Sequence, residues 1–438
     1  MSLAQQANVD LASALAEAEA NYVANNPESR ARFEAACEVM PGGNTRTSIF
    51  YSPFPLTLAS GNGARVTDVD GHEYVDFLGE YTAGLYGHSN PRIRAAVDQA
   101  LDAGIVLGGQ NETEAKLAAA VVDRFPGIER VRFTNSGTES NLMAISTARA
   151  VTGRSKVMVM KGGYHGGVFY FAVPEMPINA PFPFLLGRYN DIDFCREMIA
   201  EHGDDLACVI LEPMMGSGGC IPAAPEFLAM LRQETTRVGA LLIFDEVMTS
   251  RLGPGGLQGR LGITPDLTSL GKYIGGGLTF GAFGGRADIM DRYDPRRADA
   301  IPHAGTFNNN VLTMSAGLTG LTEVYPKDEV ADFNARGDKL RARLNGLATE
   351  RGLAAQFTGI GSMMSIHFRH GRIAGPDDAQ AGNQELRTLL HFDMFERGIY
   401  IARRGMFNMM LPMTDDDLET LVEALAEFFD SRAGLIGG

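Results

Sequence analysis

Short apolar runs that lack alternating polar residues constrain the fold of this chain most. The clearest run, residues 240–244, reads ALLIF and ends directly at Asp245 and Glu246. A run of this kind is typical of a parallel strand that is buried on both faces of a sheet. A carboxylate at the end of such a strand costs free energy unless a cation contacts it. The sequence therefore predicts a cationic partner for Asp245 at the edge of a buried sheet.

Five more strand-like runs alternate with helix-forming segments. This alternation predicts an α/β fold in which a mainly parallel sheet, covered by helices, occupies residues 65–325. The regular alternation of strands and helices ends after residue 325, so we expect a smaller α+β domain at 326–438 that packs with an N-terminal segment, 1–64. The five runs lie at 131–135, 156–160, 207–213, 266–271 and 281–285.

Local signals predict several further elements. Asp70-Gly71 separates two strand-like runs, which is typical of a hairpin. Asn90, Pro91 and Gly104 fit the cap, first turn and end of one helix. The spacing of apolar residues predicts helices at 8–22, 28–39, 328–349, 384–397 and after Thr414, and strands within 355–369 and 399–411.

Composition argues against several classes of function. A formal net charge of −15 disfavours binding to nucleic acids and anionic membranes, whose phosphates attract clustered Lys and Arg. The four cysteines and eight histidines show no metal-ligand spacing, so we expect no metal site. No apolar stretch is long enough to span a membrane, and the first residues do not resemble a signal peptide. These features predict a cytoplasmic protein.

Lys272 is the first candidate for chemistry. It follows the strand-like run 266–271 and precedes the glycines at 275–277. Burial among such neighbours lowers the pKa of a lysine, and the neutral amine can form a Schiff base with an aldehyde. The alternatives are a surface lysine and a phosphate-binding loop, but Asp266 and Tyr273 break the pattern of the loop. No GxGxxG follows the first strand, which disfavours a nicotinamide cofactor.

A turn of small residues and a Gly-rich loop offer a binding place for a cofactor. Ser136, Gly137 and Thr138 lie between a predicted strand and a predicted helix, where backbone N–H groups bind phosphate well. An ordinary helix cap is the alternative at this turn. Tyr164 lies among the glycines of KGGYHGG, residues 161–167, and can stack on a flat ring.

Together these residues match pyridoxal 5′-phosphate. This cofactor requires a lysine for its aldehyde, a carboxylate for its ring nitrogen and a cradle for its phosphate. The predicted cation beside Asp245 is then the protonated ring nitrogen. All three groups are expected at the carboxyl ends of parallel strands.

The motifs SGTE, YHGG, LEP, DEV, GK and GTFNNN occur in an order that resembles the class III aminotransferases of pyridoxal phosphate fold type I. The resemblance covers essentially the whole chain and implies a large domain with a mainly parallel seven-stranded sheet. PGGN and DEVMTSR are similar to the glutamate-1-semialdehyde aminomutase branch. FYSPFPLTLASG, EYTAGLYGHS, RFTNSGTESNLMA and SLGKYIGGG are similar to the β-phenylalanine aminotransferases of that branch.

The resemblance implies a role for each motif residue. Lys272 matches the Schiff-base lysine and Asp245 the partner of the ring nitrogen. Thr306 matches a threonine that reaches the phosphate of a neighbouring subunit, which implies a homodimer with its active sites at the interface. The remaining cofactor contacts are the phosphate cup Ser136, Gly137 and Thr138, the stacking Tyr164, Glu212 near the ring hydroxyl, and Val247 and Met248 over the opposite ring face.

Two arginines are candidates for binding a substrate carboxylate. Arg46 lies in NTRTSIF, and Arg404, in YIARRGMF, resembles the arginine of enzymes that act on β-amino acids. The planar guanidinium of arginine suits carboxylates, and the alternative is that both residues are surface charges. The apolar neighbours that can receive an aryl group are Phe50, Tyr51, Tyr81 and Met406.

The sequence thus predicts a transaminase that moves the amino group of an aromatic β-amino acid to 2-oxoglutarate. The alternative is glutamate-1-semialdehyde 2,1-aminomutase, which needs no external amine acceptor. A cofactor-binding regulator without turnover fits less well, because both Lys272 and Asp245 are present and no DNA-binding module is visible.

Overall fold

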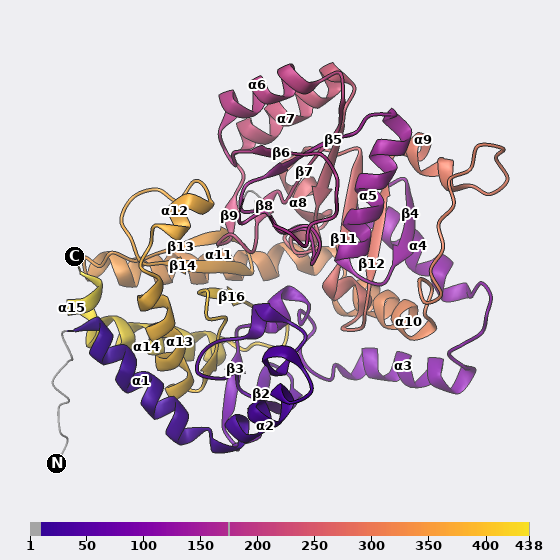
Figure 1. Cartoon of the computed structure of the whole chain (residues 1–438). Helices are drawn as coiled ribbons and strands as arrows, with labels where there is room; N and C mark the ends of the chain where they lie inside the picture. Colours follow the sequence, from indigo (N-terminus) through magenta and orange to yellow (C-terminus); the bar gives the residue numbers. More distant parts are fainter. Residues whose placement is uncertain (1–9, 174–175, 438) are drawn as a thin grey trace, which may run out of the picture.

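The computed structural model describes residues 10–173 and 176–437. Its centre is a seven-stranded sheet with helices on both faces, as the sequence predicts (Figure 1). Five neighbouring strands are parallel, and β12 is antiparallel to both of its neighbours. The order is β4 (Arg130–Thr134), β12 (Gly281–Gly285), β11 (Leu267–Gly271), β10 (Leu241–Asp245), β7 (Leu206–Leu211), β5 (Lys156–Met160) and β6 (Phe184–Gly187). The sequence analysis identified all of these strands except β6.

Strand β10 shows why an unbroken apolar run suits the middle of this sheet. Its side chains alternate between two helical layers. Leu241 and Ile243 belong to the cluster that packs on α5 (Gly137–Thr152), whereas Leu242 and Phe244 pack on α7 (Pro225–Val238). Both faces therefore require apolar residues, and polar groups of the strand are confined to its ends.

A second sheet combines strands from the N-terminal part of the chain with one strand from its C-terminal part. Strands β1 (Leu58–Asn62), β2 (Arg65–Asp68) and β3 (Glu73–Asp76) form an antiparallel meander, and β15 (Ile399–Tyr400) pairs in parallel with β3. The predicted hairpin at Asp70-Gly71 is confirmed, with Gly71 at a φ of 94° in the left-handed region. The other strands are β13 (Gln356–Ile360), β14 (Met363–His367) and β16 (Met406–Asn408) in one sheet, and β8 (Met214–Met215) with β9 (Ile221–Pro222).

The predicted helices are also present. Asn90 caps α3 (Pro91–Ala103) by accepting from the N–H of Arg92, and Thr414 caps α14 (Asp415–Ser431). The predicted helix at 8–22 corresponds to α1, and its residues 8 and 9 lie outside the described residues. The other helices are α1 (Leu11–Asn25), α2 (Pro27–Cys37), α4 (Glu112–Arg124), α6 (Ile192–His202), α8 (Gly256–Leu261), α9 (Ala287–Met290), α10 (Val311–Thr319), α11 (Lys327–Glu350), α12 (Pro376–Gln380), α13 (Gln384–Glu396) and α15 (Ala433–Ile436).

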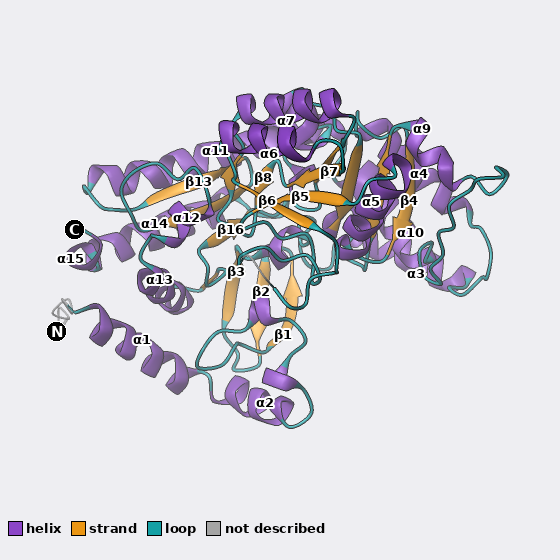
Figure 2. Ribbon diagram, turned by 45° about the horizontal axis from the view of Figure 1, so that its top comes forward, coloured by secondary structure: helices purple, strands orange, loops and turns teal. Residues whose placement is uncertain are grey.

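The N-terminal helix lies against the C-terminal third of the chain. Figures 1 and 2 show α1 beside α13, away from the large sheet. The division into 1–64, 65–325 and 326–438 stays a prediction, although this packing and the pairing of β3 with β15 agree with an N-terminal segment that joins the smaller domain. Within the described residues, no helix is both long and apolar enough to cross a membrane.

Candidate active site

The candidate site lies at the carboxyl edge of the large sheet, where Lys272 directly follows β11. Its φ of 55° is in the left-handed region, so the chain turns sharply between the strand and a short helical turn, Lys272–Gly275. The side chain is partly buried. Burial, together with the charge of Arg404, lowers the pKa of Lys272 to about 8. Near neutral pH a sizeable fraction of this amine is therefore uncharged and nucleophilic.

Asp245 ends the neighbouring strand, β10, opposite Ser269 of β11. It is 4% exposed, and its Oδ2 lies 2.8 Å from Nδ1 of His165 and accepts from Nδ2 of Asn141, also at 2.8 Å. Its Oδ1 accepts from the N–H of Val247. No lysine or arginine among the described residues pairs with this buried carboxylate, so it is available to a cationic ligand.

His165 and Asn141 are functional candidates that the sequence analysis did not identify. His165 directly follows Tyr164, and Asn141 lies one turn after Thr138 in SGTESN. Both side chains are buried, and each leaves one polar atom, Nε2 and Oδ1 respectively, without a partner in the described part of the chain. The sequence signal that could have identified these two residues is their position beside the predicted cofactor-binding motifs.

The predicted phosphate cup is the first turn of α5. Ser136 is the N-cap residue, and its hydroxyl accepts from the N–H of Glu139. This arrangement leaves the N–H groups of Gly137 and Thr138 without an acceptor in the described chain, as expected at a helix N-terminus. The hydroxyl of Thr138 accepts from the N–H of Gly167, which ties the turn to the loop that carries Tyr164.

Tyr164 and Glu212 lie together at the same edge of the sheet, after the ends of β5 and β7 respectively. Glu212 accepts from the N–H of Tyr164 at 3.3 Å and from the N–H of Gly216 at 2.8 Å. Burial raises the pKa of Glu212 to about 7, an effect that His165 opposes. The ring of Tyr164 is 44% exposed and is free to stack on a ligand.

Val247 lies between the phosphate cup and the strand that precedes Lys272. A Cβ atom added to Gly137 would lie 3.0 Å from Cγ1 of Val247, and one added to Gly271 would lie 3.1 Å from the same atom. Glycine at these positions therefore keeps the three segments close together. Met248, which is 9% exposed, lies against Gly216 beside Glu212.

The two predicted arginines have different surroundings. Arg46 forms an ion pair with Glu80, and both side chains are about half exposed. The guanidinium of Arg404 lies over the ring of Tyr81, 4.4 Å from its centroid, and has no acidic partner in the described residues. Both arginines act on the pKa of Lys272, which places them around the reactive amine.

A cavity of about 280 Å³ adjoins Tyr81 and Arg404. No Asp or Glu is among the described residues that line it. Of the predicted aryl-binding residues, Phe50, Tyr51 and Tyr81 line the cavity, whereas the buried Met406 lies outside it and contacts Arg404 through its sulfur. The wall also includes Arg387, His391, Tyr400, Ile401 and Arg403.

Thr306 is exposed, and no hydrogen bond joins it to the other candidate residues among those described. It lies in an exposed loop whose next residue, Phe307, is 59% exposed. Asn308 of the same loop bonds Asn135, which precedes the phosphate cup. Within the described residues, no group of three or more His, Cys, Asp or Glu side chains is arranged to hold a metal ion.

Comparison with known proteins identifies the family. The family model for class-III aminotransferases matches residues 50–429. The chain belongs to the class III aminotransferases. It is an enzyme that exchanges an amino group between an amino donor and a keto acid acceptor, and it has the fold type I architecture of this family.

Two relatives and one solved structure illustrate the range of this aminotransferase family. The β-phenylalanine transaminase of Variovorax paradoxus is 51% identical over 423 residues, which cover 97% of each protein. A crystal structure of a β-phenylalanine aminotransferase from the same organism aligns with a TM-score of 0.96 at 50% identity, covering 98% of this chain and 99% of the other. Glutamate-1-semialdehyde 2,1-aminomutase 2 of Bacillus licheniformis is 36% identical and covers 92% and 97% of the two chains.

The cofactor of these aminotransferases is pyridoxal 5′-phosphate, and the residues at the sheet edge fit it. Lys272 offers an amine with a lowered pKa for the aldehyde. Asp245 offers the ring nitrogen a buried carboxylate that has no guanidinium or ammonium partner among the described residues. The first turn of α5 offers the phosphate N–H groups that have no acceptor in the same part of the chain.

Proposed function

We propose that this aminotransferase moves the amino group of an aromatic β-amino acid of the β-phenylalanine type to 2-oxoglutarate. The observation that carries the proposal is the guanidinium of Arg404. It has no acidic partner within residues 10–173 and 176–437, lies on the ring of Tyr81 and is close enough to lower the pKa of Lys272. A carboxylate binds there beside an aromatic surface, and the name of the 51% identical relative agrees with such a substrate.

We assign the cofactor contacts as the resemblance predicts them. Asp245 pairs with the ring nitrogen and keeps it protonated, while His165 and Asn141 hold Asp245 in place. Tyr164 and Val247 would contact the ring, and the turn at Ser136–Thr138 would hold the phosphate. Bound pyridoxal phosphate supplies an aldehyde that links to amines and a ring that accepts electrons from the substrate.

Lys272 carries out the proton transfer. Its amine, with a pKa lowered to about 8, removes the proton from the amine-bearing carbon of the substrate and holds it at Nζ. A base is most effective when its pKa lies near the working pH, because it can then both accept and return the proton. The same amine returns a proton in the second half-reaction.

The arginines and the cavity select the substrate. Arg404 and Arg46 offer carboxylate contacts on the two sides of the site, which suits a donor with one carboxylate and an acceptor with two. The aryl group of the donor fits the aromatic part of the cavity formed by Phe50, Tyr51 and Tyr81.

We further propose a homodimer in which Thr306 reaches the phosphate of the other subunit. Two loops support this proposal, one that contains Gly109 and one that contains Asn309. The side chain of Asn309 donates to the carbonyl oxygen of Gly109, and the two loops together expose apolar side chains. A covered apolar face is expected at a subunit interface. These exposed side chains are Ile105, Val106, Leu107 and Phe307. A cytoplasmic location fits the four cysteines, all of which are unpaired.

The test is an amine-donor assay in which glutamate formation from 2-oxoglutarate is measured. β-Phenylalanine should be a substrate, and Arg404→Ala should raise its KM by about 10- to 100-fold, the loss expected for a charge-assisted contact. Arg94→Ala is the control, because Arg94 is exposed on α3 and its ion pair in the described structure is with Asp98, on the same helix.

Two outcomes would contradict the proposal. The absence of glutamate with every aromatic β-amino acid would refute the assigned donor class. Conversion of glutamate 1-semialdehyde without any 2-oxo acid would instead support the aminomutase activity named for the 36% identical relative.

A further inference from the structure

The loop at residues 216–220 connects Glu212 to a different part of the molecule. It lies between the short strands β8 and β9, which pair with each other. The N–H of Gly216 donates to Oε2 of Glu212 at 2.8 Å, which is the shorter of the two hydrogen bonds that this carboxylate accepts in the described chain. The position of Gly216 therefore affects both where the carboxylate lies and how readily it ionises.

The backbone of this loop is strained and closely packed. Gly219 and Cys220 have φ angles of 121° and 51°, and their N–H groups both donate to the carbonyl oxygen of Gly216. A Cβ atom added to Gly216 would lie 2.5 Å from Sδ of Met248. One added to Gly219 would lie 2.7 Å from Cε1 of His367. Because a residue such as Cys220 adopts a positive φ only where its surroundings impose it, contacts outside the loop must hold this conformation.

Two side chains of the sheet formed by β13, β14 and β16 supply such contacts. The carbonyl oxygen of Gly219 accepts from the hydroxyl of Thr358, on β13, at 2.7 Å and lies 3.1 Å from Nε2 of His367, at the end of β14. A carbonyl oxygen can only accept, so Nε2 of His367 carries the proton. The same nitrogen lies 2.8 Å from the hydroxyl of Thr358. The two side chains thus hold one carbonyl oxygen of the loop together.

His367 and Thr358 lie on the same face of their sheet. His367 pairs with Gln356, which is two residues before Thr358, and residues two apart in a strand point to the same face. His367 is fully buried, and burial together with the charge of Arg387 lowers its pKa to about 4. The imidazole is therefore neutral near neutral pH, and its hydrogen bond to Gly219 does not change with pH in that range.

We propose that His367 and Thr358 are positioning residues for Glu212. They hold the carbonyl oxygen of Gly219, this contact fixes the loop, and the loop places the N–H of Gly216 that orients the carboxylate. The inference rests on the proposed function, in which Glu212 lies beside the cofactor ring. It adds β13 and β14 to the elements that determine the geometry of the active site.

The ionisation of Glu212 reports this arrangement. Its pKa is raised to about 7, mainly by burial and in part by the charge of Asp245, whereas His165 opposes the rise. The N–H of Gly216 stabilises the charged carboxylate, so a weaker bond from Gly216 raises the pKa further. Tyr189 is also close to this carboxylate and stays uncharged, because burial raises its own pKa. Burial likewise raises the pKa of the Cys220 thiol to about 12.

The test is a pH titration of the loaded enzyme, followed by the absorbance of pyridoxal phosphate. A charge beside the ring changes its absorbance, so the parent enzyme should show a transition near pH 7 that is missing in Glu212→Gln. In Thr358→Val this transition should move to higher pH by about 0.5 to 1 unit, as expected when a hydrogen bond to a carboxylate weakens. Valine has the shape of threonine without its hydroxyl, so the fold should be retained.

Conservative variants separate positioning from packing. Thr358→Ser keeps the hydroxyl and should keep the midpoint of the parent enzyme. His367→Gln keeps an N–H donor near the place of Nε2 and should shift the midpoint less than His367→Leu does. The matched control is Thr235→Val on α7, which removes a buried hydroxyl that donates to the carbonyl oxygen of Leu231, also at 2.7 Å. This control should lower the thermal stability without moving the midpoint.

Either of two results would overturn the inference. One is a midpoint in Thr358→Val and His367→Leu that equals that of the parent enzyme, which would mean that the two side chains only support their sheet. The other is the absence of any transition that depends on Glu212, because its carboxylate would then not act on the cofactor. Since no turnover is measured, a failure to transaminate β-phenylalanine would refute the proposed donor and leave this inference intact.

Discussion

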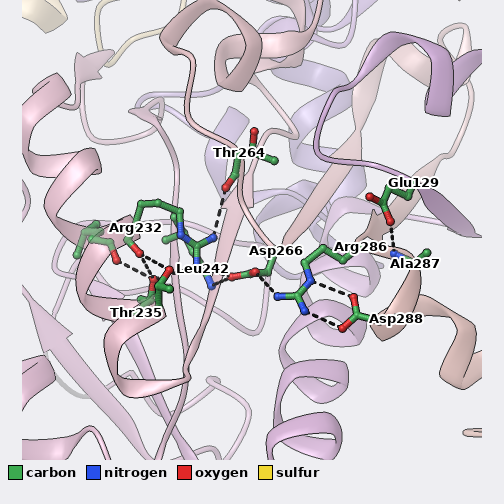
Figure 3. Close-up of polar contacts among 11 residues, drawn as sticks. Glu129, Arg232, Thr235, Leu242, Thr264, Asp266, Arg286, Ala287 and Asp288 are labelled. Carbon is green, nitrogen blue, oxygen red and sulfur yellow. Dashed lines mark hydrogen bonds and ion pairs between the residues drawn. The ribbon is translucent and has the colours of Figure 1, made fainter.

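Two buried aspartates lie at opposite ends of neighbouring strands and differ in their partners. Asp266 precedes β11 at the amino edge of the sheet, and Figure 3 shows it between Arg232 and Arg286. Its Oδ2 also accepts from the N–H of Leu242 at 2.8 Å. Asp245, at the carboxyl edge of β10, has no guanidinium or ammonium partner in the described chain. The carboxylate of Asp266 is thus paired with arginines within the protein, whereas the carboxylate of Asp245 is available to a ligand.

This difference indicates that Asp266 mainly stabilises the fold and that Asp245 mainly serves the function. The acid at the amino edge ties α7, β10, β11 and the segment after β12 together through charged hydrogen bonds, so we expect it to stabilise the fold. The acid at the carboxyl edge is held in place by His165 and Asn141, and its charge is available to the cofactor. Substitution of each aspartate by asparagine should therefore have a different main effect.

The largest effect is expected for Asp245→Asn. Asparagine keeps the shape of the side chain but removes the charge that favours a protonated ring nitrogen. Turnover should fall roughly 100- to 1000-fold, as for the loss of one preorganised electrostatic interaction. The measurement is kcat under saturating substrates, together with thermal denaturation, which should change little. Near-normal turnover would show that this acid has another purpose.

A smaller effect is expected of pH on the rate at which the cofactor attaches to Lys272, at the same edge of the sheet. Pyridoxal phosphate attaches to the neutral form of Lys272, which predominates above its lowered pKa of about 8. The rate of attachment to the cofactor-free protein should therefore rise about tenfold per pH unit well below pH 8 and level off above it. The absorbance of the attached cofactor reports the rate. A rise that continues to pH 10 would indicate a lysine with an ordinary pKa.

Asp266→Asn should produce the opposite pattern to Asp245→Asn. The free energy of unfolding should fall by about 2 kcal/mol, because two partly exposed arginines lose their carboxylate partner. Thermal denaturation should show a lower midpoint, while kcat of the folded enzyme stays unchanged.

The matched control is Asp288→Asn. Asp288 pairs with the same Arg286 but is exposed, so its removal should cost less than about 0.5 kcal/mol. Equal losses for the two variants would show that the burial of Asp266 contributes nothing.

Much of this comparison could be predicted from the sequence. The apolar run at 240–244 placed Asp245 at the end of a buried strand, and the strand before Lys272 placed both groups at one edge. Local signals such as Asn90 and Asp70-Gly71 also located a helix start and a hairpin correctly, because caps and turns depend on neighbouring residues.

Contacts between distant segments could not be predicted. The pairing of His165 with Asp245 and of Glu80 with Arg46 joins residues that are far apart in the chain. The short strand β6 and the parallel pairing of β15 with β3 likewise depend on tertiary packing rather than on a local pattern. The role of Thr306 depends on a second subunit and stays a prediction.

The most direct test of the account is the chemical location of the cofactor. The loaded enzyme is reduced with borohydride, digested and analysed by mass spectrometry for the lysine that carries the pyridoxyl group. The account predicts that this group is on Lys272, and that Lys116→Ala, which changes an exposed lysine paired with Glu112, leaves the labelling unchanged. A pyridoxyl group on any other lysine would contradict the assignment of the active site to the carboxyl edge of β10 and β11.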